Sequence, residues 1–142
     1  MSTFQILPHV LALAGAYALA LPIAWNREKE DRSAGLRTFP LVALASCGFV
    51  QASETLLSGS PDGLAKVIEG VITGVGFIGG GAILKQGDAV RGTATAASLW
   101  ATGAIGVAVG LGSYDVGVTI SAFTFATLLF MTPFKEPDPG KD

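Results

Sequence analysis

The stretch that decides the fold is LAKVIEGVITGVGFIGGGAIL, residues 64–84, a mostly apolar run with two charged residues near its start. A helix needs about 20 such residues to cross the hydrocarbon core of a bilayer. Comparable stretches lie at residues 6–25, 38–57, 93–111 and 115–132, and only short connections separate them. The sequence therefore predicts an all-α, polytopic membrane protein with about five transmembrane helices in a compact, glycine-rich bundle.

The composition of the 142-residue chain supports a membrane protein. Half of the residues are apolar, only 14% are charged, and the mean hydropathy is +0.55. An average soluble domain carries about 25% charged residues. A net charge of −2 argues against a nucleic-acid partner, because proteins that bind nucleic acids present basic surfaces. One His and one Cys give no nucleophile–base pair, so we expect neither an enzyme nor a bound cofactor.

Lysine and arginine are distributed unequally between the two sides of the expected bundle. Eight of the nine follow the first, third or fifth span, and only Lys66 falls on the other side. Cytoplasmic loops carry such an excess of positive charge. We therefore expect the N-terminus outside and the C-terminus in the cytoplasm. Residues 1–133 form the expected transmembrane domain, and residues 134–142 form a short cytoplasmic tail with no soluble C-terminal domain.

Three carboxylates lie toward the outer ends of the second and third spans: Glu54, Asp62 and Glu69. Mg²⁺ keeps several of its waters and takes few protein ligands, so these groups are candidate metal ligands. Snorkelling of charged side chains to the membrane surface is an equally good explanation. In the fourth span, steps of three and four residues place Thr95, Ser98 and Thr102 on one helix face. These hydroxyls either line a hydrated path or bond to helix backbones.

Glycine is abundant, with 19 residues, and its spacing is typical of helix packing in lipid. The literal G-x-G-x-x-G at residues 74–79 lies inside an apolar run, so we favour packing over nucleotide binding. The three glycines at 79–81 leave a break in the third span open, although a straight helix is favoured. Whether the close contacts form within one chain or between chains is also open, the first being commoner. The predicted packing positions are Gly70, Gly74, Gly76, Gly80, Gly103 and Gly106.

Three segments together resemble the MgtC/SapB family of bacterial inner-membrane proteins. They are Arg27-Glu28 with residues 34–38 (AGLRT), the glycine-rich run at 74–81, and residues 90–92 (VRG) with 95–100 (TAASLW). The chain departs from the family pattern at Asn26, Phe39 and Glu69. The resemblance implies about five spans and an association with growth at low magnesium. Many virulence-linked members also carry a soluble C-terminal domain, so a role in virulence is in doubt.

From these observations, we interpret the chain as an inner-membrane protein of magnesium homeostasis that regulates or binds other proteins. The alternative is a transporter or channel for Mg²⁺ or another ion. The expected partners are the lipid bilayer, other inner-membrane proteins and further copies of the chain. Arginine recognises carboxylates and phosphates through planar, bidentate contacts. The expected functional surface is the cytoplasmic face, where arginines flank the helices. Its residues are Arg27, Glu28, Arg37, Asp88 and Arg91.

Overall fold

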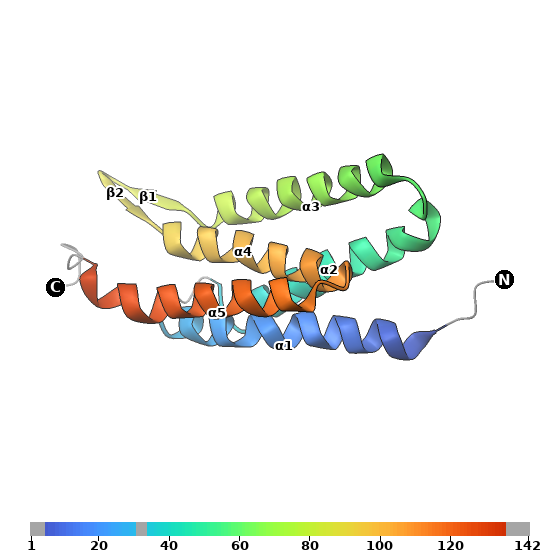
Figure 1. Ribbon diagram of the computed structural model, residues 1–142. Helices are drawn as coiled ribbons and strands as arrows, with labels where there is room; N and C mark the ends of the chain where they lie inside the picture. The colour runs from blue at the N-terminus through green and yellow to red at the C-terminus, as the bar shows by residue number, and fades with distance from the viewer. Residues whose placement is uncertain (1–4, 31–33, 136–142) are drawn as a thin grey trace.

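A computed structural model describes residues 5–30 and 34–135, which form five long helices and a small hairpin. The helices run alternately up and down the bundle, so each connection lies at one of its two ends (Figure 1). The elements are α1 (Ile6–Glu30), α2 (Thr38–Leu57), α3 (Pro61–Gly81), β1 (Leu84–Gln86), β2 (Ala89–Arg91), α4 (Thr93–Gly110), α5 (Tyr114–Met131) and the 3₁₀ turn η1 (Thr132–Phe134).

Four of the five helices in the described ranges are long and apolar enough to cross a membrane. They are α1, α3, α4, and α5 together with η1. The helices α1 and α3 run in the same direction (Figure 1). The chain must therefore cross back from the end of α1 to the start of α3, and α2 makes this crossing. The all-α, polytopic architecture expected from the sequence is therefore confirmed.

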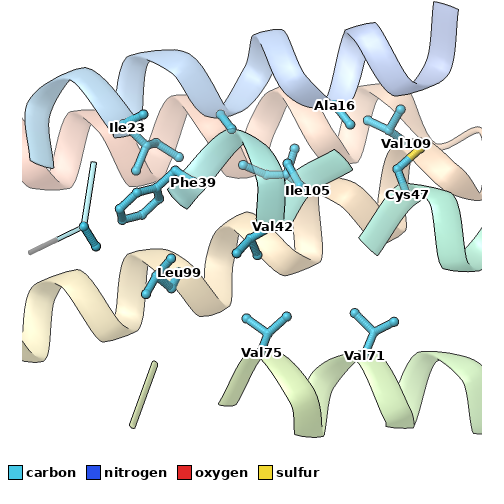
Figure 2. Packing of buried hydrophobic residues seen from close by; sticks show 14 of the residues in the cluster. Ala16, Ile23, Phe39, Val42, Cys47, Val71, Val75, Leu99, Ile105 and Val109 are labelled. Carbon is cyan, nitrogen blue, oxygen red and sulfur yellow. The ribbon is translucent and has the colours of Figure 1, made fainter. Parts of the chain in front are cut away.

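The helix α4 lies at the centre of the bundle and packs against each of the other four helices. Ten of its 18 residues are buried, whereas only three of the 21 residues of α3 are. Its Leu99, Ile105 and Val109 meet Ile23 of α1 and Phe39 of α2 in the apolar core (Figure 2). Because α4 packs against all four other helices, it positions them relative to one another.

Local chemistry explains where the helices begin and end. The hydroxyl of Ser60 accepts a hydrogen bond from the Gly63 backbone N–H at 3.2 Å, and Pro61 occupies the first turn of α3. Both are favoured at a helix N-terminus. At the other end α3 is continuous through the three glycines and stops at Gly81. The helix α1 continues past the predicted span to Glu30, and the basic residues in its last turn suit the negative end of the helix dipole.

The polar break after α3 is an antiparallel β-hairpin, which the sequence analysis did not foresee. Its register pairs Leu84 with Arg91 and Lys85 with Val90. A two-residue turn, Gly87-Asp88, joins the strands, and Gly87 has a φ of 60°. Glycine adopts this left-handed conformation without steric cost, which suits a tight hairpin. The hairpin extends beyond the ends of α3 and α4 (Figure 1).

Candidate functional site

One end of the bundle gathers the C-termini of α1 and α5, the N-termini of α2 and α4, and the hairpin (Figure 1). We call it the basic end. Six described cationic residues belong to these segments: Arg27, Lys29, Arg37, Lys85, Arg91 and Lys135. The opposite end joins α2 to α3 and α4 to α5, and Glu54, Asp62 and Asp115 lie toward it. The polarity of charge expected from the sequence is therefore present along the bundle.

Arg27 is the buried charge of the basic end, with only 6% of its surface exposed. Its guanidinium donates through Nε and Nη2 to the Asn26 carboxamide oxygen, at 3.1 and 2.6 Å. The Asn26 side chain thus orients the neighbouring arginine. A buried charge must be hydrogen-bonded to be tolerated, so this arrangement fixes Arg27 as part of the scaffold.

Glu28 ties the connection between α1 and α2 back onto the end of α1. Its Oε2 accepts a hydrogen bond from the Leu36 backbone N–H at 2.9 Å. A Cβ on Gly35 would overlap this carboxylate and lie 2.9 Å from the Glu28 Cα, so the connection requires glycine there. The Gly35 carbonyl in turn accepts from the N–H groups of Thr38 and Phe39, which begin α2. Glu28 therefore holds the loop that presents Arg37.

Arg37, Asp88 and Arg91 are exposed at the basic end, in contrast to Arg27. Arg91 closes β2, and Gly92 follows with a φ of 84°. A Cβ on Gly92 would overlap the Ala82 carbonyl oxygen, so the base of the hairpin is fitted closely to the end of α3. The two segments that carry Arg37 and Arg91 thus reach the same end of the bundle, each through a glycine that cannot be replaced without movement.

The hydroxyl face of α4 is buried inside the bundle. Thr95, Ser98 and Thr102 each have 3% of their surface exposed or less. The Ser98 Oγ donates to the Ala94 carbonyl at 2.6 Å, and the Thr102 Oγ1 donates to the Ser98 carbonyl at 2.7 Å. Such bonds to the preceding turn use the hydroxyl hydrogen within its own helix. Of the two interpretations of this face, the geometry at Ser98 and Thr102 favours bonding to the backbone.

The three outer carboxylates stay apart. Glu54 lies near the end of α2, Asp62 in the first turn of α3, and Glu69 about 10 Å further along that helix, and all three are exposed. Among the residues that the structure describes, no three His, Cys, Asp or Glu side chains form a group that could hold a metal ion. The fold does not bring these carboxylates together as one set of ligands.

The predicted packing glycines divide into two groups. In α4, a Cβ on Gly103 would lie 3.0 Å from Val75 Cγ2, and one on Gly106 would overlap the Ala43 carbonyl oxygen. Gly110 is equally close to α2, at 2.8 Å from Val50 Cβ. In α3 the structure shows no contact within the chain, which was the commoner of the two alternatives, because a Cβ would meet no atom within 4 Å at any of four predicted positions. These positions are Gly70, Gly74, Gly76 and Gly80.

One contact between helices escaped the sequence analysis. The Ser121 hydroxyl of α5 donates to the Leu19 carbonyl of α1 at 2.7 Å, although 102 positions separate the two residues. A serine in an apolar span is the usual signal for such a bond, but the partner helix cannot be identified from it. Gly35 and Gly92, in contrast, lie in or beside the quoted family segments, and the positions of those segments could have pointed to them.

Comparison with known proteins identifies the family of the chain. The model of the MgtC family matches residues 13–136. Protein MgtC of Salmonella typhimurium strain LT2 is 40% identical over 107 residues, which cover 75% of this chain and 45% of the relative. Protein MgtC of Brucella abortus strain 2308 is 39% identical over 128 residues, covering 89% and 53%. The chain spans about half the length of the curated relatives that it matches.

No solved structure matches the chain. The family match covers most of α1 and all of α2 to α5, and the apolar helices fit a lipid bilayer. The segments that suggested the family from the sequence converge on the basic end or on the helices that lead to it. This chain therefore belongs to the MgtC family of bacterial membrane proteins.

Proposed function

We propose that this chain is a non-catalytic regulatory or interaction protein that serves magnesium homeostasis in the bacterial inner membrane. The proposal places its N-terminus outside and its C-terminus in the cytoplasm, because a basic end is retained on the cytoplasmic side. The link to magnesium rests on the family, through the association that the resemblance implies. The basic end is then the surface that reaches cytoplasmic or membrane partners.

The observation that carries the proposal is the difference in burial between the arginines of the basic end. Arg27 is buried and bonded to Asn26, whereas Arg37 and Arg91 are exposed on segments held by Gly35 and Gly92. Exposed ion pairs contribute only about 0–1 kcal/mol, so stability gives little reason for two exposed arginines on fixed supports. A guanidinium recognises carboxylate or phosphate with a planar, bidentate geometry that lysine lacks.

The interior of the bundle also favours a regulatory role and argues against ion conduction. Apolar side chains fill the space around α4, and Ser98 and Thr102 direct their hydroxyl hydrogens to their own helix. An ion path through a membrane protein needs polar groups that face the path. These hydroxyls are already engaged, so an opening through this bundle would first require its helices to separate.

Replacement of Arg37 and Arg91 by lysine tests the proposal. Arg37→Lys and Arg91→Lys keep the positive charge, so expression and topology should be unchanged, whereas growth under magnesium limitation should be impaired. Lys85→Arg and Lys135→Arg are matched controls that alter cations of the same end without removing a guanidinium. If both lysine variants grow like the wild type, the arginines serve only as anchors and the functional surface lies elsewhere.

Reconstitution in liposomes tests the transport alternative directly. With a Mg²⁺-sensitive dye inside, we expect no more gradient-driven influx than into protein-free liposomes. Influx that depends on the protein and is abolished by Glu69→Ala would overturn the proposal and establish transport. A Gly76→Ala protein, altered on the same helix but without loss of charge, separates a specific effect of Glu69 from damage to α3.

A further inference from the structure

One side of α3 has no partner within the described part of the chain. Three buried positions, Val71, Val75 and Gly79, face the bundle, and Figure 2 shows the two valines directed toward the core. The opposite side is exposed along its whole length, and Phe77 retains 85% of its surface. Steps of three, four and seven place its members on one helical stripe. This outer face of α3 consists of Lys66, Glu69, Gly70, Thr73, Phe77 and Gly80.

Lipid is a poor cover for this face because it carries two charges within a membrane span. Lys66 and Glu69 lie about 8 and 12 Å along the axis from the start of α3. Among the described residues, no side chain forms an ion pair with either of them. A lysine can snorkel to the membrane surface, but the shorter glutamate reaches less far. Charges inside spans usually face protein or water and pair with one another.

The glycines of the outer face point to a close protein neighbour. Each glycine inside a helix costs about 1 kcal/mol relative to alanine. In α4 this chain places glycine where another backbone or side chain would otherwise collide, as at Gly106. At Gly70 and Gly80 no group of the same chain approaches closely, so no contact within the chain offsets the cost of glycine. A helix packed from outside would supply the missing contact, as small residues do between helices in lipid.

We propose that the outer face of α3 binds the same face of a second copy of this chain. Membrane insertion gives both copies one orientation, so the two α3 helices lie parallel about a two-fold axis along the membrane normal. The face is self-complementary in charge, because Lys66 of each copy then lies beside Glu69 of the partner subunit. Such an isologous contact uses the same patch twice and closes at a dimer.

The shape of the face suits the same arrangement. Gly70, Thr73 and Gly80 allow the helix axes to approach closely, and each Phe77 can pack over the small residues of the facing helix. Thr73 follows Gly70 by three positions and Gly80 follows Thr73 by seven, so the small residues stay on one stripe of the helix. The bundle residues of α3 remain on the other side, so dimerisation leaves the contacts of Val71 and Val75 with α4 and α2 unchanged.

Cysteine cross-linking in native membranes tests the interface without dissociating it. In a Cys47→Ala background, Thr73→Cys should give a disulfide-linked dimer under mild oxidation, because disulfides require Cα atoms within about 7 Å. Ile72→Cys is the matched control, since Ile72 is exposed at the same depth but lies about 100° around the helix. Equal cross-linking at both positions, or none at Thr73→Cys, would overturn the proposal.

A heterotypic charge test distinguishes pairing between chains from pairing along one helix. Two differently tagged copies are co-expressed, one with Lys66→Glu and the other with Glu69→Lys. Each variant alone opposes like charges and should co-purify with itself less than the wild type does, whereas the mixed pair restores opposite charges and should recover association. Failure of the mixed pair to exceed both single variants would contradict the proposed register.

Neutral variants guard against misfolding of the charge-reversed copies. Lys66→Gln and Glu69→Gln should each weaken dimerisation by at least about three- to twentyfold, the range measured for one polar contact between membrane helices, because each change removes both symmetry-related contacts. Monomer stability should stay unchanged in both, because both side chains are exposed on the side of α3 away from the bundle. Neither residue belongs to the basic end, so these outcomes are independent of the growth experiments on Arg37 and Arg91. Wild-type association of both neutral variants would show that the charges do not contribute to an interface.

Discussion

The glycines of α4 and those of α3 have similar spacing but different surroundings. At Gly106 a side chain would collide with the backbone of α2, and at Gly110 it would meet Val50 and the Cys47 carbonyl. At Gly74 and Gly76 it would meet nothing. The two helices thus carry similarly spaced glycines. In α4 another helix of the chain packs against them, whereas at Gly74 and Gly76 of α3 no part of the chain does.

The difference teaches that a glycine pattern reports a close approach without naming what approaches. In α4 the neighbour is α2 or α3 of the same chain, and the cost of glycine is offset by backbone contact. In α3 the apolar residues Val71 and Val75 already provide the contact with the bundle, on another side of the helix. Replacing glycine by a larger residue should therefore destabilise the protein in α4 but be tolerated at the open positions of α3.

The largest difference should follow from leucine. Gly106→Leu forces a large side chain into the Ala43 backbone, and we expect a cost at or above the upper end of the roughly 1–3 kcal/mol typical of overpacking. We expect no folded protein after purification in mild detergent, measured by size-exclusion chromatography. Gly74→Leu is the matched control, and its monomer should remain folded. Equal loss of both proteins would mean that the Gly74 side of α3 packs within the chain after all.

A smaller cost is expected at the other end of the α2–α4 contact. In Gly110→Ala the new methyl group lies 2.8 Å from Val50 Cβ and 3.0 Å from the Cys47 carbonyl oxygen. Both atoms belong to a helix that can shift only as a unit, so we expect about 2 kcal/mol of destabilisation. Unfolding by SDS in mixed micelles measures the free energy. A stability within experimental error of the wild type would show that α2 gives way easily.

The contact between α3 and α4 should be softer still. Gly103→Ala places a methyl group 3.0 Å from Val75 Cγ2, the end of a side chain instead of a backbone, so about 1 kcal/mol is expected. Adding Val75→Ala removes the two methyl groups involved and should recover part of the loss. A double-mutant cycle in the same unfolding assay measures this coupling, and strictly additive effects would argue against direct contact.

The helices themselves were largely predictable from the sequence. The spans expected at 38–57 and 93–111 differ from α2 and α4 by at most one residue, because apolar length and polar breaks are local properties. The meeting of Arg27, Arg37 and Arg91 at one end was also foreseeable. Each span reverses the chain, so connections separated by two spans must lie on the same side.

The direction of the α3 glycines was not predictable in the same way. The charged residues of α3 lie in its N-terminal half, and its glycines are spread over several sides of the helix, so the sequence does not reveal which glycines meet the bundle. The hairpin was missed for another reason. Gly87-Asp88 is a recognised two-residue turn signal, but strands of three residues are too short to show an alternating pattern.

The smallest effect tests the open side of α3 most directly. Gly76 lies beside the outer face, and a Cβ there would meet no atom within 4 Å. Alanine favours a helix over glycine by up to about 1 kcal/mol, partly because it restricts the unfolded chain. Gly76→Ala should therefore be neutral or slightly stabilising in the SDS unfolding assay, the opposite sign to Gly103→Ala. A loss of stability would mean that another part of the chain packs against this side of α3. The contrast between the glycines of α3 and α4 would then be wrong.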